Sequence, residues 1–384
     1  PARGPPRPGV DAEGRIGFYD PFSLYNGSLM VRTVPVLLVL LLLATGCSSQ
    51  PATPEDRAEA VDAIVRDLMA DSDVPGASLA VVQHGDVVYQ PSYGVADRAS
   101  ERPTTDSTIY QLASASKMIA GTALMTLVDD GRLSLGDSIH THLPDLPDAW
   151  RGVTVRQAMS HTSGLPSLIN PETGDLLGGA TMETAWNAVQ TKPLADTTTT
   201  TWRYNQTGYE VARRIVEALS GQSWEAFVRE RVFRPAGMRS TFYLGEPVPD
   251  STRLATPYRE DFAAFDFAEA YEYYIPTAAG LFSTTADLAR FATALAAGQL
   301  VSPDAQAQMW TSTPFDDSTI DAIEGYGIGW TVDAQDGHRR VWHSGGGKAI
   351  VVHYPDDDLT VVLLTNRVGL DVVSPATDVA EIYL

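Results

Sequence analysis

The segment ASASKMIAGTALMTLVDDG, residues 113–131, begins with a serine and a lysine three positions apart, Ser114 and Lys117. The apolar residues that follow from Met118 to Val128 have helical spacing, and Gly131 can end the helix. The spacing places Ser114 and Lys117 on one face of the first turn. The positive end of the helix disfavours the ammonium form of a lysine there, and its free N–H groups can hold an oxyanion. A serine beside an amine base is a working nucleophile, so the segment predicts covalent catalysis.

Lysine is rare in this chain, and this bears on how Lys117 is interpreted. The sequence holds 24 Arg and only 3 Lys, at positions 117, 192 and 348. Taken alone, a Ser-x-x-Lys spacing also fits a solvated lysine on a surface turn. Arginine stays protonated at any working pH, whereas a desolvated lysine can lose its proton. Because the chain otherwise uses arginine for positive charge, Lys117 is interpreted as a titratable base.

Two further motifs follow in order, Tyr204-Asn205-Gln206 and His343-Ser344-Gly345-Gly346-Gly347. Together with Ser114-x-x-Lys117 they resemble the three motifs of the serine β-lactamase and penicillin-binding protein superfamily. The variant is closer to class C β-lactamases and the related esterases and DD-peptidases, which place a tyrosine first in the second motif. Four other segments are similar to family signatures: Val74–Ala77, Ser160–Pro166, Ala279–Thr284 and Tyr326–Trp330.

The resemblance implies a role for each matching residue. Ser114 would be the acylated nucleophile and Lys117 its base, and Tyr204 would carry protons to the leaving group and from water. The backbone N–H groups of Ser114 and Gly346 would form the oxyanion hole, with the third motif on an edge strand facing Ser114. The residues expected to bind substrate are Gln206, His343, Ser344 and Gly345. No metal or organic cofactor is implied.

Two positions depart from the β-lactamase pattern. Gln206 stands where asparagine is usual, and His343 stands where lysine is usual. A histidine with an ordinary pKa near 6.5 is mostly neutral at pH 7, so it holds a β-lactam carboxylate weakly. This favours an esterase or peptidase over an efficient β-lactamase. Lys348 or the Arg339-Arg340 pair could still supply charge nearby, although an exposed strand end is the preferred interpretation of that pair.

The pattern of apolar residues predicts an α+β fold of the β-lactamase/transpeptidase type. Glu55–Asp71 has helical periodicity, and β-branched runs at Ser78–Gln83 and Asp86–Tyr89 flank a hairpin signal, His84-Gly85. Further strands are expected at 327–332, 340–342, 349–354 and 359–365, and helices at 155–159, 208–219, 223–233 and 286–295. Strands near both ends imply one antiparallel sheet, in parts 55–130 and 320–384, with an all-helical region inserted at 131–319.

The first 54 residues are expected to lie outside this domain, which spans 55–384. Residues 1–29 have the composition of a disordered leader or of untranslated upstream sequence. Residues 30–46 form a basic and then apolar signal peptide, whose apolar run is too short for a transmembrane helix. Cys47, the one cysteine, follows Ala-Thr-Gly as in a bacterial lipoprotein and would be lipidated, with 47–54 as a tether. An ordinary secretory signal cut nearby is the alternative.

The charge of the chain argues against nucleic-acid binding, and the remaining candidate residues are weak. The formal net charge of −21 argues against nucleic acid, whose phosphates need a basic surface. His140-Thr141-His142 has metal-like spacing but is interpreted as a solvated loop, and His161 is interpreted as a packing or capping residue. The aromatic group at 271–274 fits a substrate cleft or a core equally well.

The leading hypothesis is a serine hydrolase of the cell envelope, anchored by lipid or secreted. It would act on a small ester, peptide or β-lactam through an acyl-enzyme on Ser114. The alternative is a penicillin-recognising binding or sensor module without turnover.

The interpretation of Cys47 predicts a change in partitioning. A full-length protein expressed in a bacterium should sediment with membranes, and the Cys47→Ser protein should be released or left unprocessed, because the thiol that carries the lipid is gone. Immunoblots of membrane and soluble fractions measure this. Equal distribution of the two proteins would contradict lipidation at Cys47.

Overall fold

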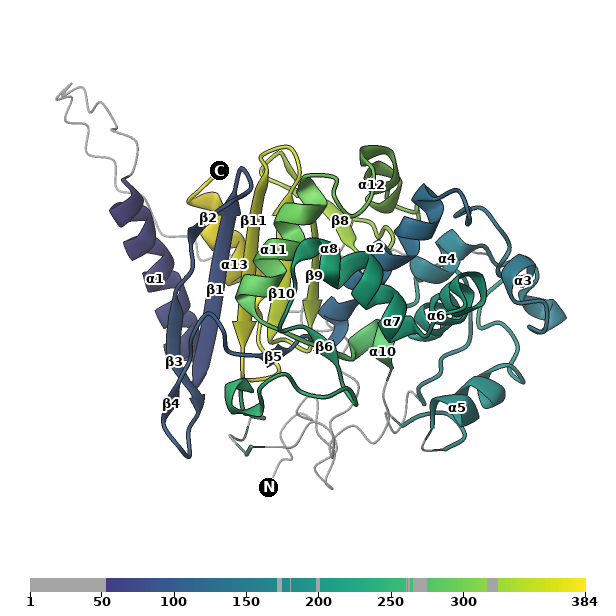
Figure 1. Ribbon diagram of the computed structural model, residues 1–384, viewed down its shortest axis with the longest axis horizontal. Helices are drawn as coiled ribbons and strands as arrows, with labels where there is room; N and C mark the ends of the chain where they lie inside the picture. Colours follow the sequence, from purple (N-terminus) through teal and green to yellow (C-terminus); the bar gives the residue numbers. More distant parts are fainter. Residues whose placement is uncertain are drawn as a thin grey trace, which may run out of the picture.

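The computed structural model describes residues 53–170, 175–179, 181–197, 201–259, 261, 263–264, 275–315 and 324–384 (Figure 1). The predicted leader, signal peptide, Cys47 and most of the tether therefore lie outside the described residues, as does the aromatic group at 271–274. Within the described ranges, none of the helices combines the length and apolar character needed to span a bilayer.

A large antiparallel sheet brings the two ends of the domain together. Its strand order is β4-β3-β1-β11-β10-β9-β8, and β2 pairs with the other part of β1. The N-terminal strand β1 lies beside β11 in the middle, with Ala77 opposite Thr365 and Gln83 opposite Leu359. The strands are β1 (Gly76–Gln83), β2 (Asp86–Tyr89), β3 (Ser92–Asp97), β4 (Arg102–Pro103), β8 (Thr331–Gln335), β9 (His338–Gly345), β10 (Ala349–Tyr354) and β11 (Leu359–Thr365). This confirms the predicted α+β fold and the sheet built from distant segments.

Both faces of the sheet are buried, which explains why the central strands read as continuous apolar runs. Alternate residues of β1 enter different cores: Leu79 and Val81 face one core, and Ala80 and Val82 the other. The first core includes Val61 and other residues of α1 (Pro54–Asp71) and α13 (Val373–Glu381). In Figure 1, α11 (Thr285–Ala296) crosses the opposite face.

The inserted region is mainly helical but also contains two short strands. Its helices are α3 (Ile139–His142), α4 (Val155–Met159), α5 (Met182–Val189), α6 (Thr207–Ser220), α7 (Trp224–Val228), α8 (Arg234–Ala236), α10 (Pro276–Ala279), α11 and α12 (Pro303–Met309), with short turns η3 (Asp148–Trp150), η4 (Arg229–Phe233) and η5 (Ser251–Arg253). The strand β7 (Leu281–Ser283) pairs with β6 (Phe242–Tyr243) on one side and with β5 (Tyr110–Gln111) on the other, and β5 shortly precedes Ser114. The prediction that this region is all-helical was therefore wrong in this detail.

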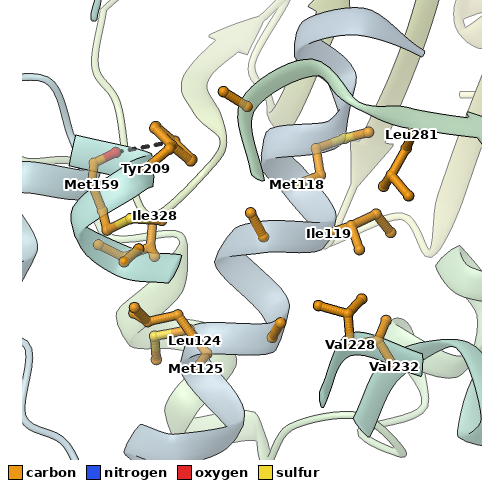
Figure 2. Close-up of a cluster of buried hydrophobic side chains, with 14 of the residues drawn as sticks. Met118, Ile119, Leu124, Met125, Met159, Tyr209, Val228, Val232, Leu281 and Ile328 are labelled. Carbon is orange, nitrogen blue, oxygen red and sulfur yellow. Dashed lines mark hydrogen bonds between the residues drawn. The ribbon is translucent and has the colours of Figure 1, made fainter. Parts of the chain in front are cut away.

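The helix predicted after Ser114, α2 (Ser116–Asp129), lies between the sheet and the helical region. Every residue from Ser116 to Leu127 is buried. Figure 2 shows its Met118 and Ile119 beside Leu281, and its Leu124 and Met125 near Ile328. Such a helix is apolar on all sides because it is packed on all sides.

One predicted strand, 327–332, begins only at Thr331. Its first residues form a loop that packs against the backbone of α2. A methyl group at Gly329, whose φ is +84°, would lie 2.2 Å from the Lys117 carbonyl oxygen, and one at Gly121 would lie 2.1 Å from the Ile328 oxygen. These glycines permit a close backbone approach, which periodicity alone does not distinguish from a strand.

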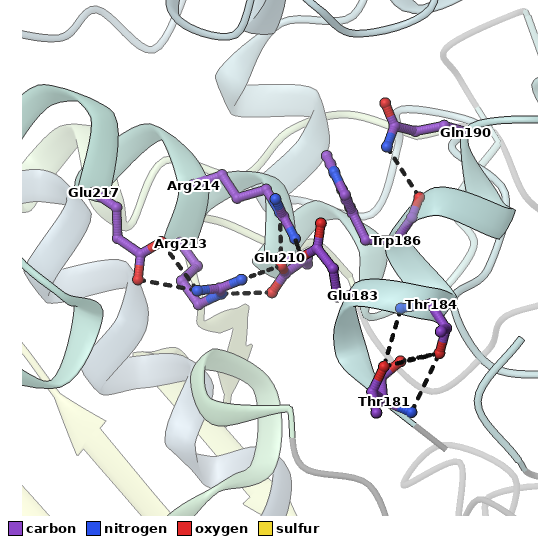
Figure 3. A network of polar contacts seen from close by, with 9 residues as sticks. All are labelled: Thr181, Glu183, Thr184, Trp186, Gln190, Glu210, Arg213, Arg214 and Glu217. Atoms are coloured by element: carbon purple, nitrogen blue, oxygen red, sulfur yellow. Dashed lines mark hydrogen bonds and ion pairs between the residues drawn. The ribbon is translucent and has the colours of Figure 1, made fainter. Parts of the chain in front are cut away.

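A buried carboxylate joins α6 to α5 (Figure 3). Glu210 is fully buried and accepts hydrogen bonds from Arg213 and Arg214, with Arg214 Nε 2.8 Å from Glu210 Oε1. Arg214 also donates to Glu183 of α5 at 2.7 Å, and Arg213 to Glu217 at 3.0 Å. The network therefore fixes the helix that follows the second motif.

Replacement of Glu210 by alanine should lower the free energy of unfolding by about 3 kcal/mol, because two largely buried guanidinium groups lose a shared carboxylate. Denaturant unfolding measures this, with Glu59→Ala, an exposed position on α1, as the matched control. Equal loss in both variants would show that the network does not stabilise the fold.

Candidate active site

The nucleophile candidate lies on a tight turn that precedes α2. Ser114 is the middle residue of a 3₁₀ turn, η2 (Ala113–Ala115), and is 7% exposed. Ala113 has φ of +47°, a left-handed conformation that is rare outside glycine. Ser116 Oγ donates to the Ala113 carbonyl oxygen at 2.6 Å and accepts from the Leu281 N–H at 3.2 Å. Ser116 thus links the turn that contains Ser114 to β7 of the small sheet.

Lys117 is the second residue of α2, and its side chain is fully buried. Its Nζ donates to the Ala278 carbonyl oxygen of α10 at 2.9 Å. The same atom lies 4.8 Å from the centre of the Tyr204 ring and 5.1 Å from that of Tyr209. Burial holds the pKa of Lys117 well below the ordinary value of 10.5, which favours the neutral amine that a base requires.

The second motif lies in the segment just before α6, and its Tyr204 contacts Lys117. The Tyr204 ring packs against His161, 4.5 Å between centroids, and lies 6.4 Å from His343. Gln206 is the N-cap residue of α6 and 3% exposed, and its Oε1 accepts no hydrogen bond from the described residues. A buried amide oxygen in this position can accept a hydrogen bond from a substrate N–H.

His161 lies beside Tyr204, although its sequence context predicted only a packing or capping role. Its Nδ1 accepts the Asn205 N–H at 3.3 Å, so it does cap the neighbouring segment. Its ring also contacts Tyr204 and lies 4.7 Å from that of Tyr326. Burial is the largest cause that holds the pKa of His161 well below 6.5. Its place beside Tyr204 depends on tertiary packing. In the sequence, only the family signature at 160–166 pointed to this position.

The third motif lies at the end of β9, which is not an edge strand along its whole length. β8 pairs with β9 only as far as Trp342, and β10 pairs on the other side. Beyond Trp342, the edge of β9 that β8 does not cover lies against η2. A methyl group at Gly345 would lie 1.9 Å from the Leu112 carbonyl oxygen and 3.0 Å from the Ser114 nitrogen. Gly346 follows in the turn toward β10, with φ of +58°. The two residues predicted to form the oxyanion hole are therefore close in space.

His343 is fully buried, and its Nδ1 lies 2.6 Å from the Ser344 carbonyl oxygen. Since a carbonyl only accepts, Nδ1 carries the proton and Nε2 is left as an acceptor. Burial, reinforced by Lys117, lowers the pKa of His343 to about 3. The imidazole is thus neutral at pH 7, which is the state expected from the sequence. Ser344 is buried at 4% exposure.

The two arginines that could supply charge near the third motif bond to other groups, and the lysine is buried. Arg340 pairs with Asp333 on β8 at 2.6 Å, and Arg339 donates to the Trp310 carbonyl oxygen. Lys348 is 3% exposed and donates to Gln111 Oε1. The two histidines with metal-like spacing have separate partners, since His140 Nε2 meets the Pro147 oxygen and His142 Nε2 meets Asp137.

Comparisons with known proteins identify the family and the fold. A sequence model of the family described as Beta-lactamase matches residues 61–383. Penicillin-binding protein 4* of Bacillus subtilis (strain 168) is 26% identical over 321 residues, which cover 74% of this chain and 66% of that protein. The chain thus spans about two thirds of the length of this curated relative.

Two solved structures share the fold. EstCE1, a hydrolase with promiscuous acyltransferase activity, has a TM-score of 0.74 at 21% identity, covering 86% of this chain and 99% of that one. The D-amino acid amidase from Ochrobactrum anthropi SV3, in complex with L-phenylalanine amide, has a TM-score of 0.71 at 23% identity, covering 85% and 98%.

The contact between Gly345 and the Ser114 turn generates a prediction. Gly345→Ala should slow covalent labelling of Ser114 by an activated phosphonate about 100-fold, because the methyl group displaces the nucleophile from β9. Labelling rates by mass spectrometry measure this. Gly152→Ala is the control, since a methyl group at Gly152 meets nothing within 4 Å. An unchanged rate in Gly345→Ala would show that this close approach does not position Ser114.

Proposed function

The chain belongs to the Beta-lactamase family, and we propose that it is a serine hydrolase that forms an acyl-enzyme on Ser114. Lys117 takes the proton of the Ser114 hydroxyl as Oγ bonds to the substrate carbonyl carbon. The bond from that carbon to the leaving group then breaks, and Tyr204 delivers a proton to the departing atom. In the second half water attacks the acyl carbon and its proton passes to Tyr204. The bond from that carbon to Ser114 Oγ breaks, and Lys117 returns its proton to Oγ, which restores the hydroxyl and the neutral amine.

The environment of Lys117 is the observation that carries this proposal. The Lys117 amine is fully buried, donates to a carbonyl oxygen and lies near two tyrosine rings. This environment stabilises a permanent positive charge poorly. It suits an amine that must be neutral before each turnover. Its position three residues after Ser114 supplies the partner from which it takes the proton.

The oxyanion of each tetrahedral intermediate would be held by the backbone N–H groups of Ser114 and Gly346. Each donor of this kind contributes roughly 3 to 4 kcal/mol to transition-state stabilisation. The close approach of Gly345 to the Ser114 nitrogen supports this assignment, because it sets the end of β9, which Gly346 directly follows, beside the nucleophile.

We propose that esters or amides are hydrolysed in preference to β-lactams. The neutral His343 supports this, since it cannot supply the permanent positive charge that a lysine would offer to a β-lactam carboxylate. A hydrolase with promiscuous acyltransferase activity and a D-amino acid amidase among the structural neighbours are consistent with such substrates. We also propose that the protein works in the cell envelope, and the support for this is the signal and the cysteine at residues 30–47.

Two substitutions test the assignment of nucleophile and base. Ser114→Ala should abolish phosphonate labelling and hydrolysis of 4-nitrophenyl esters. Lys117→Arg should lower kcat by about 100-fold or more, although it keeps a positive charge, because arginine cannot accept the proton. Stopped-flow release of nitrophenolate and intact-mass measurement report the two steps.

The outcomes separate the proposal from its rivals. Near-normal turnover in Lys117→Arg would remove Lys117 as the base, and labelling that persists in Ser114→Ala would remove Ser114 as the nucleophile. Labelling of the native protein without any turnover of esters, amides or β-lactams would instead identify a binding or sensor module.

A further inference from the structure

His161 bonds to the chain on both sides of Tyr204, and the function proposed above does not yet use it. Its carbonyl oxygen accepts the N–H of Arg203 at 2.8 Å, and its Nδ1 accepts the N–H of Asn205 at 3.3 Å. The residues directly before and after Tyr204 are therefore bonded to one histidine. The His161 ring also packs against the ring of Tyr204, with 4.5 Å between centroids. His161 thus contacts both the backbone around Tyr204 and its side chain.

His161 has an unusual backbone conformation. Its φ is +65°, in the left-handed region that residues other than glycine rarely adopt. Seven non-glycine residues in the described part of the chain have a positive φ, and His161 is the buried one among them, at 1% exposure. Such a conformation persists only where the surrounding structure holds it, and these positions gather at functional sites. Conformation and burial together point to a role in the site.

The His161 ring is itself enclosed by other aromatic rings. The ring centroids of Tyr326, Tyr209 and Trp202 lie 4.7, 5.5 and 5.7 Å from that of His161. The hydroxyl oxygens of Tyr209 and Tyr326 are hydrogen-bonded to each other at 3.2 Å. A ring that is packed in this way has little room to turn, so Tyr204 rests against a fixed surface.

The protonation state of His161 shows how it acts on Tyr204. Because Nδ1 accepts a backbone N–H, the proton of the neutral ring is on Nε2. Nε2 is buried and has no hydrogen-bond partner among the described residues. Burial holds the pKa of His161 well below 6.5, so the ring is neutral near pH 7. The ring therefore adds no charge to the site, and its effect on Tyr204 is one of position.

We propose that His161 is a positioning residue, which holds the Tyr204 hydroxyl where it exchanges protons with the leaving group and with water. This inference rests on the role proposed for Tyr204. A proton donor must lie within hydrogen-bond reach of the departing atom, and a displacement of about 1 Å lowers a rate by about 100-fold. A change at His161 should therefore impair the steps that use Tyr204 more than the attack by Ser114, which uses Lys117.

The test compares two esters of one acid, 4-nitrophenyl butanoate and ethyl butanoate. The 4-nitrophenolate anion departs without a proton, whereas ethoxide must receive one, so formation of the acyl-enzyme depends on Tyr204 chiefly for the ethyl ester. His161→Ala should lower kcat/KM for the ethyl ester by about 10- to 100-fold more than for the nitrophenyl ester. Loss of the same size for both esters would indicate a general structural defect and overturn the inference.

A graded variant and a matched control accompany this comparison. His161→Asn keeps an acceptor near the place of Nδ1 and tolerates a positive φ, so its ratio of kcat/KM values should lie between those of the native and His161→Ala proteins. If only His161→Asn folds, a native ratio in it would overturn the inference. His84→Ala is the control, because His84 also has a positive φ, of +53°, but is exposed in the turn after β1. It should leave the ratio unchanged.

A double-mutant cycle shows whether His161 acts through Tyr204. Tyr204→Phe should shift the ratio in the same direction as His161→Ala, and adding His161→Ala to Tyr204→Phe should change it little further. An additional shift as large as that of His161→Ala alone would show that His161 acts independently of Tyr204.

The same variants separate this inference from the proposed function. If Tyr204→Phe keeps the native ratio, the role proposed for Tyr204 fails, and the inference fails with it. If Tyr204→Phe shifts the ratio but neither His161 variant does, the inference alone fails. Crystal structures of the native and His161→Asn proteins need no turnover: the Tyr204 ring should be displaced in the variant, and an unmoved ring would overturn the inference while the hydrolase proposal stands.

Discussion

The burial of Lys117 is the constraint on which the rest of the site depends. An amine can be kept in the interior only if its N–H groups have an acceptor and its charge can be given up. The Ala278 carbonyl of α10 supplies the acceptor, and the two tyrosine rings supply a surface that tolerates either protonation state. Gly329 lies close to the Lys117 carbonyl oxygen, so the backbone that carries Lys117 is also closely packed. Lys117 thus lies in the helix that separates the helical region from the sheet.

Much of the fold could be predicted from the sequence because local patterns determine it. The apolar run after Ser114 predicted α2, and the β-branched runs predicted β1, β2, β10 and β11. The structure nevertheless starts α2 at Ser116, since the residues before it form a 3₁₀ turn stabilised by Ser116 Oγ and Leu281. The strand predicted at 327–332 was wrong in its first half, because its glycines serve a close approach to α2 rather than a ladder.

The candidate site was predicted in part. The three motifs lie together as the family resemblance implied, and the neutral state of His343 follows from its burial. The contacts of His161 with Tyr204, of Gln111 with Lys348 and of Lys117 with Ala278 were not predicted. Each joins residues that are far apart in the chain, and no spacing or periodicity encodes such pairs.

The pairing of β1 with β11 has a consequence for the order of events during synthesis. Ala77 lies opposite Thr365, so the centre of the sheet cannot form until the chain has left the ribosome through Thr365. Pairings at such long sequence separation are slow to form, because loop-closure entropy must be overcome before contacts compensate it. Gly345, which lies against the Ser114 turn, is likewise made long after Ser114. Ser114 therefore acquires the neighbours of the candidate active site only after β9 has been made and has paired.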